Sequence, residues 1–107
     1  MEPLGEEARA EITASSGDDG AFVVRLAGEL DISTVPAIEA QLTSAIASAS
    51  PPITFDLSAL EFMDSSAIAM LLRVVAKTGP VTVRHPSRTV RQVVQATGLQ
   101  DVLRVES

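Results

Sequence analysis

A strand, a helix and a second strand are encoded in succession by residues 53–84, ITFDLSALEFMDSSAIAMLLRVVAKTGPVTVR. The run Ile53–Leu57 is typical of a short strand, and a loop is expected to continue from it through Glu61. Residues 64–66 then open a helix, which Gly79-Pro80 ends before the next strand, Val81–Arg84. A β-α-β unit of this kind makes a right-handed crossover, so its two strands are parallel and close together. The buried side of the helix is expected to hold Ile68, Leu71, Leu72 and Val75.

The sequence before this unit predicts a hairpin and a helix. The alternating segments 10–14 and 22–27 are typical of two strands joined by a loop of more than two residues. Residues 28–31, Gly-Glu-Leu-Asp, are expected to break the second strand, and Thr34 is expected to cap the helix that follows. One face of that helix is predicted to hold Val35, Ile38, Leu42 and Ile46.

The sequence after the unit predicts a third helix and a last strand. The helix follows Pro86-Ser87, with Gly98 just beyond its end, and residues 102–105 are typical of an edge strand. Its apolar face is expected to hold Val90, Val93 and Val94. The element order β-β-α-β-α-β-α-β predicts an α/β fold, with helices packed on a mixed four- to five-stranded sheet. Residues 1–8 are expected to form a flexible tail and residues 9–107 a single domain.

Composition argues against several classes of protein. The 107 residues suffice for one domain, and the 46% that are apolar suffice for one core. Without cysteine the chain has no disulfide, thiolate metal site or cysteine nucleophile. A net charge of −6 argues against nucleic acid or an anionic membrane as a direct partner. The acidic start is unlike a signal peptide, and no apolar run is long enough to span a bilayer, so we expect a cytoplasmic protein.

The charges are distributed unevenly along the chain. Residues 1–64 hold twelve acidic side chains and two basic ones, whereas residues 65–107 hold two acidic side chains and six basic ones. This asymmetry produces either an ordinary dipolar surface or a field that steers an oppositely charged partner toward the protein.

The sequence shows no catalytic motif. His85 is the only histidine, so a site built from several histidines is excluded and a loop role is expected. The phosphate-binding glycine patterns Gly-x-x-x-x-Gly-Lys and Gly-x-Gly-x-x-Gly are absent, and we expect no catalytic residue, cofactor or metal. Three aspartates lie at strand or loop boundaries, where they either cluster as a cation or acid–base site or satisfy helix and loop amides. They are Asp31, Asp56 and Asp64.

The segment Asp64-Ser65-Ser66 is the strongest candidate site. Its serines lie at the predicted start of a helix, where free backbone N–H groups and the helix dipole stabilise an anion. A phosphate on Ser65 would add about −1.5 to −2 charges at a place that helix geometry tolerates. The alternative is that both serines only cap the helix.

The same helix is predicted to carry a contact surface. Ser66, Arg73 and Lys77 form a polar stripe along it, with Ala69 and Met70 beside the stripe. Small and flexible apolar residues next to a serine suit a protein partner, although Met70 can equally turn into the core.

Three segments together resemble the STAS domain of bacterial anti-sigma factor antagonists. They are residues 28–31 (Gly-Glu-Leu-Asp), 56–58 (Asp-Leu-Ser) and 62–68 (Phe-Met-Asp-Ser-Ser-Ala-Ile), supported by residues 97–99 (Thr-Gly-Leu). The similarity covers nearly the whole chain and implies a STAS-like fold with a regulatory switch. In that family the serine after the aspartate, here Ser65, is phosphorylated by an anti-sigma factor that is also a serine kinase. The unphosphorylated antagonist binds the anti-sigma factor and frees a sigma factor, and a serine phosphatase resets the released, phosphorylated form.

The resemblance also implies how individual residues contribute. Asp31 matches a family position beside the phosphorylated serine, Asp64 precedes that serine, and Ser66 shapes its loop. Ala67 stands where the family usually has glycine. Compared with glycine, alanine favours the helix by roughly 0.5–1 kcal/mol, and it is expected to place a methyl where the partner's backbone approaches. The residues expected to bind the partner are Asp31, Asp64, Ser66, Ala67, Ala69, Met70 and Arg73.

Two other functions stay open. A STAS subunit can instead scaffold a lipid-transport ATPase or a stress-signalling complex, in which case Ser65→Ala would have no effect and the chain would co-purify with a large assembly. A small enzyme or nucleotide-binding module is the weaker alternative, because no catalytic constellation is visible. For the antagonist we expect a monomer or weak dimer that binds proteins rather than nucleic acid or membrane.

Overall fold

The computed structural model describes residues 9–16, 20, 22–47, 49 and 52–106, so the expected tail at residues 1–8 lies outside it. Within this part, five strands form one sheet in the order β2-β3-β4-β5-β6. β2 and β3 are antiparallel, and every other neighbouring pair is parallel. The strands are β2 (Ala10–Ser16), β3 (Phe22–Leu30), β4 (Ile53–Met63), β5 (Val81–Arg84) and β6 (Leu103–Glu106). The helices are α1 (Val35–Ile46), α2 (Ser65–Thr78), α3 (Arg88–Thr97) and the short 3₁₀ turn η1 (Leu99–Asp101).

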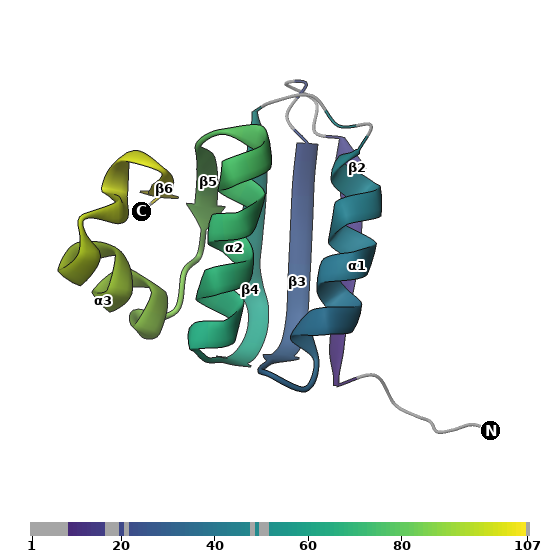
Figure 1. Ribbon diagram of the computed structural model, residues 1–107, viewed down its shortest axis with the longest axis horizontal. Coiled ribbons are helices and arrows are strands. Elements are labelled where there is room, and N and C mark those ends of the chain that lie inside the picture. The colour runs from purple at the N-terminus through teal and green to yellow at the C-terminus, as the bar shows by residue number, and fades with distance from the viewer. Residues whose placement is uncertain (1–8, 17–19, 21, 48, 50–51, 107) are drawn as a thin grey trace.

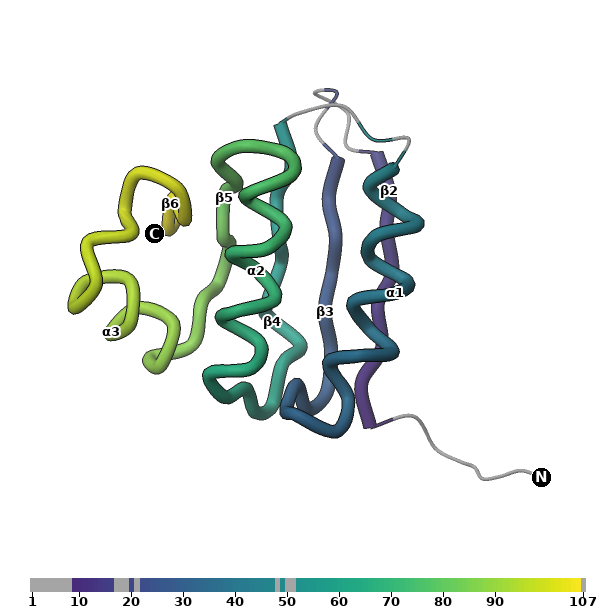
Figure 2. Tube along the Cα trace, in the orientation of Figure 1, coloured from purple at the N-terminus to yellow at the C-terminus, as the bar shows by residue number. Residues whose placement is uncertain are grey.

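The helices cover one face of the sheet. α1 and α2 lie side by side in front of it, and α3 stands at the β6 end (Figures 1 and 2). Inward-facing strand residues such as Leu26, Phe55 and Val83 are fully buried against the helices. Alternate residues on the same strands face the opposite side, where Arg25 and Ser58 are exposed. The predicted α/β fold with a mixed sheet is therefore confirmed.

The helices begin and end where local sequence predicts, but the prediction that the Thr34 side chain caps α1 is wrong, because its hydroxyl donates to the carbonyl of Glu29 in the preceding strand. The expected face of α1 is buried at all four positions, Val35, Ile38, Leu42 and Ile46. α3 begins after Ser87, whose hydroxyl accepts a hydrogen bond from the Val90 N–H, and ends at Gly98 in the left-handed conformation. Ile68 and Leu71 of α2 and Val90 and Val94 of α3 are buried as expected, whereas Leu72, Val75 and Val93 are only partly buried.

Two predicted strand ends are wrong. β3 continues through Leu30 instead of breaking at Gly28, and β4 continues to Met63 where a loop through Glu61 was expected. The pairing of β3 with β4 shifts register twice, between Arg25 and Ala27 and between Gly28 and Glu29. These irregularities absorb extra residues and let both strands run on. Both strands consequently deliver their last residues to the same edge of the sheet.

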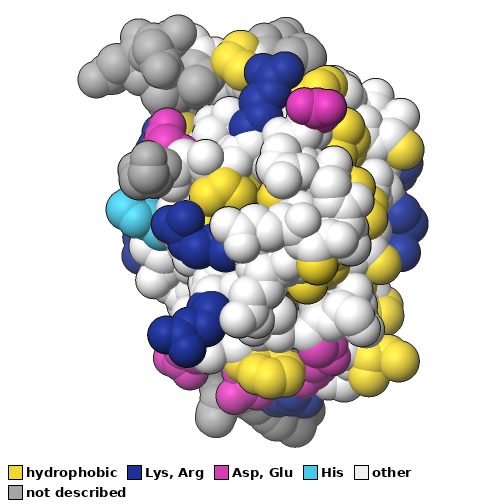
Figure 3. All heavy atoms as spheres, turned by 90° about the vertical axis from the view of Figure 1, so that its left-hand side faces the viewer, with side chains coloured by type: hydrophobic (Ala, Val, Ile, Leu, Met, Phe, Trp, Pro, Cys, Tyr) yellow, Lys and Arg dark blue, Asp and Glu magenta, His cyan; other side chains and the backbone are white. Residues whose placement is uncertain are grey.

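The last elements of the basic C-terminal half, α3 and β6, lie at one end of the molecule (Figure 1). Lys and Arg side chains are spread over that side among neutral and hydrophobic ones, rather than gathered in one patch (Figure 3). Whether this dipolar charge distribution steers a partner stays a prediction.

Candidate functional site

Ser65 is exposed at the first position of α2, directly after β4. The preceding Asp64 caps the helix, because its carboxylate accepts a hydrogen bond from the Ser66 N–H at 2.8 Å. The Asp64 N–H in turn donates to the carbonyl of Leu30 at 3.1 Å. This bond joins the ends of β3 and β4, so the loop that follows β3 lies beside the start of α2.

Asp31 organises the loop between β3 and α1. One of its carboxylate oxygens accepts hydrogen bonds from the hydroxyl of Ser33 at 2.6 Å and from the N–H groups of Ser33 and Thr34. Its other oxygen forms an ion pair with the Arg9 guanidinium at 2.5 Å. The hydrogen bond from the Ser33 hydroxyl is the largest cause that lowers the pKa of Asp31. Partial desolvation raises this pKa, whereas the two N–H groups and Arg9 lower it further, and the net result is a pKa lowered from 3.8 to about 2. The loop beside Ser65 is thus held by a permanently charged aspartate.

The carboxyl of Asp31 is expected to titrate near pH 2 in a side-chain carbon NMR titration. Because its pKa is lower in the folded than in the unfolded chain, it contributes stability above pH 3.8 that is lost as the pH falls through about 2. Ser33→Ala is expected to raise the pKa more than Arg9→Gln does, since the hydroxyl is the largest cause of the shift. Titration of the wild-type carboxyl near pH 4, or a larger effect of Arg9→Gln, would contradict this account.

A groove of about 360 Å³ runs between α1 and α2 from the start of α2. Arg73 crosses it and holds Glu39 of α1 with two hydrogen bonds, from Nε at 2.7 Å and from Nη2 at 2.6 Å. This forked contact lowers the pKa of Glu39 and raises that of Arg73. The end of the groove away from the start of α2 therefore holds this fixed pair of charges, whereas the end next to the start of α2 is mainly apolar. Its lining comprises Ile32, Val35, Pro36, Glu39, Ser66, Ala69 and Arg73.

Two hydrophobic side chains flank the start of α2, and the sequence pattern did not predict that they are exposed. Ile32, in the loop after β3, is 78% exposed, and Phe62, near the end of β4, is 52% exposed. Ile32 lines the groove on the α1 side, whereas Phe62 lines a smaller hollow of about 160 Å³ with Ser87 and Thr89 on the α3 side. The only signal for them in the sequence was their position. Ile32 directly follows Asp31, and Phe62 lies three residues before Ser65.

The structure corrects part of the predicted contact surface. Ala67 and Met70 are both 0% exposed in the core, so neither offers atoms to a partner. The α2 face that carries them packs toward the sheet, and the methyl of Ala67 lies in the core instead of where a partner's backbone would approach. Ser66, Ala69 and Arg73 do line the groove together.

The three aspartates do not gather into one site. Asp56 lies within β4 in register with Arg25, whereas Asp31 and Asp64 follow the ends of β3 and β4. Asp56 accepts a hydrogen bond from the Ser58 N–H at 2.9 Å. The expectation that Asp64 caps its helix while the other two satisfy loop amides is confirmed, with the difference that Asp56 does so from within a strand.

The family profile, a curated relative and solved structures all relate this chain to STAS domains and anti-sigma factor antagonists. A profile of the family described as "Mlab, STAS domain" matches residues 13–105. The anti-sigma F factor antagonist of Lysinibacillus sphaericus is 38% identical over 82 residues, which are 72% of this chain and 70% of that protein. A solved anti-sigma factor antagonist from Mycobacterium paratuberculosis has a TM-score of 0.73 at 30% identity and covers 90% of this chain and 84% of its own. The phosphorylated Bacillus cell fate determinant SpoIIAA has a TM-score of 0.64 at 31% identity, with 91% and 92% covered.

The fold and the family of these relatives agree with the fold of this chain. Anti-sigma factor antagonists are in general not enzymes. In the described part of the chain, no helix combines the length and the apolar character needed to cross a membrane. The family profile spans most of the chain, and the mixed five-stranded sheet matches the solved relatives. The chain therefore belongs to the STAS domain family, in which its relatives are anti-sigma factor antagonists.

Proposed function

We propose that this chain is an anti-sigma factor antagonist controlled by phosphorylation of Ser65. In the unphosphorylated state it binds an anti-sigma factor, so that a sigma factor is freed for transcription. The anti-sigma factor acts as a serine kinase on Ser65, the modified chain is released, and a serine phosphatase restores it. These exchanges take place in the cytoplasm, and the chain itself supplies no catalysis.

The exposed Ser65 hydroxyl at the head of α2 is the observation that carries this proposal. A phosphoryl acceptor needs only a positioned hydroxyl, because the kinase brings ATP, Mg²⁺ and the catalytic base. The positive end of the helix dipole favours a negative charge at this position of the folded chain, while the N–H groups of Ser66 and Ala67 already donate to Asp64. Modification can therefore change the surface without requiring the domain to unfold.

The surroundings of Ser65 suit a partner that leaves after phosphorylation. Ile32 and Phe62 supply exposed apolar contacts on either side of the helix start, and the groove beside Ile32 can receive a side chain of the partner. The phosphate would add about −1.5 to −2 charges beside Asp31 and Asp64. In an interface that excludes water, this charge meets like-charge repulsion and a desolvation cost, which favours release.

The scaffold alternative is not favoured. The named relatives of 30% identity or more are anti-sigma factor antagonists, and one of them is recorded in its phosphorylated form.

Incubation with the anti-sigma factor and ATP, followed by intact mass measurement and site mapping, tests the proposal. The wild-type chain is expected to gain one phosphate on Ser65, and Ser65→Ala is expected to gain none. The matched control Ser44→Ala changes an exposed serine of α1 and should still be phosphorylated. Phosphate on another residue, or none on the wild-type chain with an active kinase, would defeat the proposed switch.

A further inference from the structure

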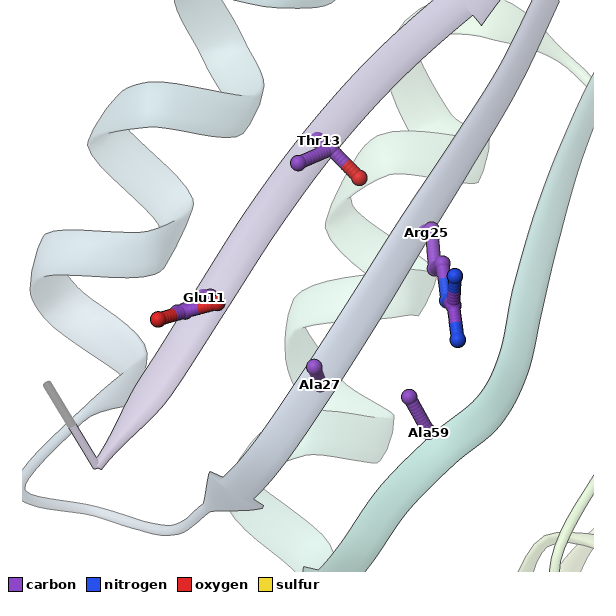
Figure 4. Close-up of a pocket in the computed structure, with 5 residues that line it drawn as sticks. All are labelled: Glu11, Thr13, Arg25, Ala27 and Ala59. Atoms are coloured by element: carbon purple, nitrogen blue, oxygen red, sulfur yellow. The ribbon is translucent and has the colours of Figure 1, made fainter.

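The face of the sheet opposite the helices carries an ordered set of charged side chains. Among the described residues no helix packs on this face, and Glu11, Thr13 and Arg25 project from it (Figure 4). Side chains that share a pairing register also share a face, because strand residues alternate between the two sides of a sheet. The pairing therefore fixes which charges stand next to one another.

One register crosses four strands with charges of alternating sign. Arg25 of β3 pairs with Asp56 of β4, Asp56 pairs with Arg84 of β5, and Arg84 pairs with Glu106 of β6. The row thus reads plus, minus, plus, minus from β3 to β6. Among the described residues only Arg84 and Glu106 close an ion pair within the row, at 2.9 Å. Cross-strand pairing stabilises the sheet, but it leaves the charges of Arg25 and Asp56 available to a second surface.

A row with this sequence of signs is complementary to itself when it is reversed. Consider a two-fold axis that is parallel to the strands and lies in front of the outer face, over the gap between β4 and β5. Rotation by 180° about this axis sets Arg25 opposite Glu106 of a second copy. The same rotation sets Asp56 opposite Arg84, and the symmetry repeats both contacts, as in an isologous two-fold interface. We propose that this outer face of the sheet pairs with the same face of a second copy of this chain.

The surface beside Arg25 has room for the opposing carboxylate. A hollow of about 280 Å³ lies next to Arg25, where Ala27 and Ala59 leave space between β3 and β4, and Glu11 and Thr13 of β2 line its other side (Figure 4). Glu106, which would meet Arg25, lies on the edge strand β6 and has a half-exposed side chain. A carboxylate at the edge of one copy can therefore enter a depression in the other.

The contact is weak and sensitive to salt. It consists mainly of exposed ion pairs, which contribute little each and are screened as the ionic strength rises. It leaves Ser65 free, because α2 begins on the opposite side of the sheet. The inference is independent of the phosphorylation switch, so either can fail without the other.

Sedimentation equilibrium of the full chain in about 20 mM and about 500 mM NaCl tests the proposal. Reversible dimerisation is expected at low salt, with a dissociation constant that rises at least about tenfold at high salt. Arg25→Glu and Glu106→Arg are each expected to weaken dimerisation, because each places like charges in opposition. The double variant restores opposite charges at every contact between the copies and is expected to dimerise more tightly than either single variant, although it loses the Arg84–Glu106 ion pair within each chain. Arg91→Glu, the same charge change on the exposed side of α3, is the matched control and should have no effect.

Several outcomes would overturn the proposal. A wild-type chain that stays monomeric at low salt and millimolar concentration has no such interface. Equal dimerisation of Arg25→Glu and the wild-type chain, or no recovery in the double variant, would place the contact elsewhere. If a variant does not fold, amide chemical shifts of the wild-type chain on dilution still decide the question. They must change at residues 25, 56, 84 and 106 of the outer face and not in the groove between α1 and α2.

Discussion

Ser65→Glu is expected to bind the anti-sigma factor at least about tenfold more weakly than the wild-type chain, a change of about 1.4 kcal/mol in binding free energy. The added carboxylate directly follows Asp64, lies beside the loop that Asp31 organises, and imitates part of the phosphate charge. Within the interface it is both repelled and deprived of water, as the phosphate would be. Ser65→Asp is expected to behave in the same way, whereas Ser65→Ala should bind like the wild-type chain and stay bound in the presence of ATP.

Titration calorimetry with the purified anti-sigma factor measures these affinities. Ser44→Glu makes the same substitution at an exposed serine near the C-terminal end of α1 and is expected to bind the anti-sigma factor as the wild-type chain does. Thermal unfolding separates a binding defect from a folding defect. Because a helix start favours an anion, Ser65→Asp and Ser65→Glu should keep the free energy of unfolding within about 1 kcal/mol of the wild-type value. Equal binding by all variants would defeat the switch, and a large loss of stability would contradict the position of Ser65.

Local sequence predicted the helices because their signals are local. The spacing of Val35, Ile38 and Leu42 fixes the buried side of α1, and Asp64 and Ser87 cap the next two helices. The same locality placed Ser65 at a helix start. The position of Asp31 beside Ser65 came from the resemblance to the STAS family, and the bond from Asp64 to Leu30 that joins their loops was not foreseeable.

Features that depend on pairing and packing were predicted less well. The register shifts between β3 and β4 extend both strands beyond their apparent ends, and no local pattern signals such irregularities. Met70 was undecided between surface and core because its burial depends on how α2 is rotated against the sheet. The exposure of Ile32 and Phe62 also follows from tertiary structure, since an apolar residue at an element boundary is more often buried than exposed.

Gly28→Ala is expected to lower the free energy of unfolding by about 4 kcal/mol or more, the largest stability effect that the structure predicts. Gly28 lies in β3 with a φ of +87°, a conformation that residues with a side chain rarely adopt. A methyl group there would overlap the backbone carbonyl oxygen of Arg9, the residue just before β2. That oxygen accepts a hydrogen bond from the Glu29 N–H at 2.8 Å, so moving it away would break the contact between the two strands.

Gly79→Ala is the matched control because it separates backbone strain from steric overlap. Gly79 has a similar φ of +89°, but a methyl group there would meet nothing within 4 Å. Gly79→Ala should therefore cost only the strain, about 1–3 kcal/mol. Urea denaturation followed by circular dichroism measures both losses. Equal losses would mean that β2 shifts without cost and that Arg9 does not need its observed position. A larger loss for Gly28→Ala would show that the overlap with the Arg9 carbonyl adds a steric cost to the backbone strain, because the close approach of β2 to β3 leaves no room for a side chain.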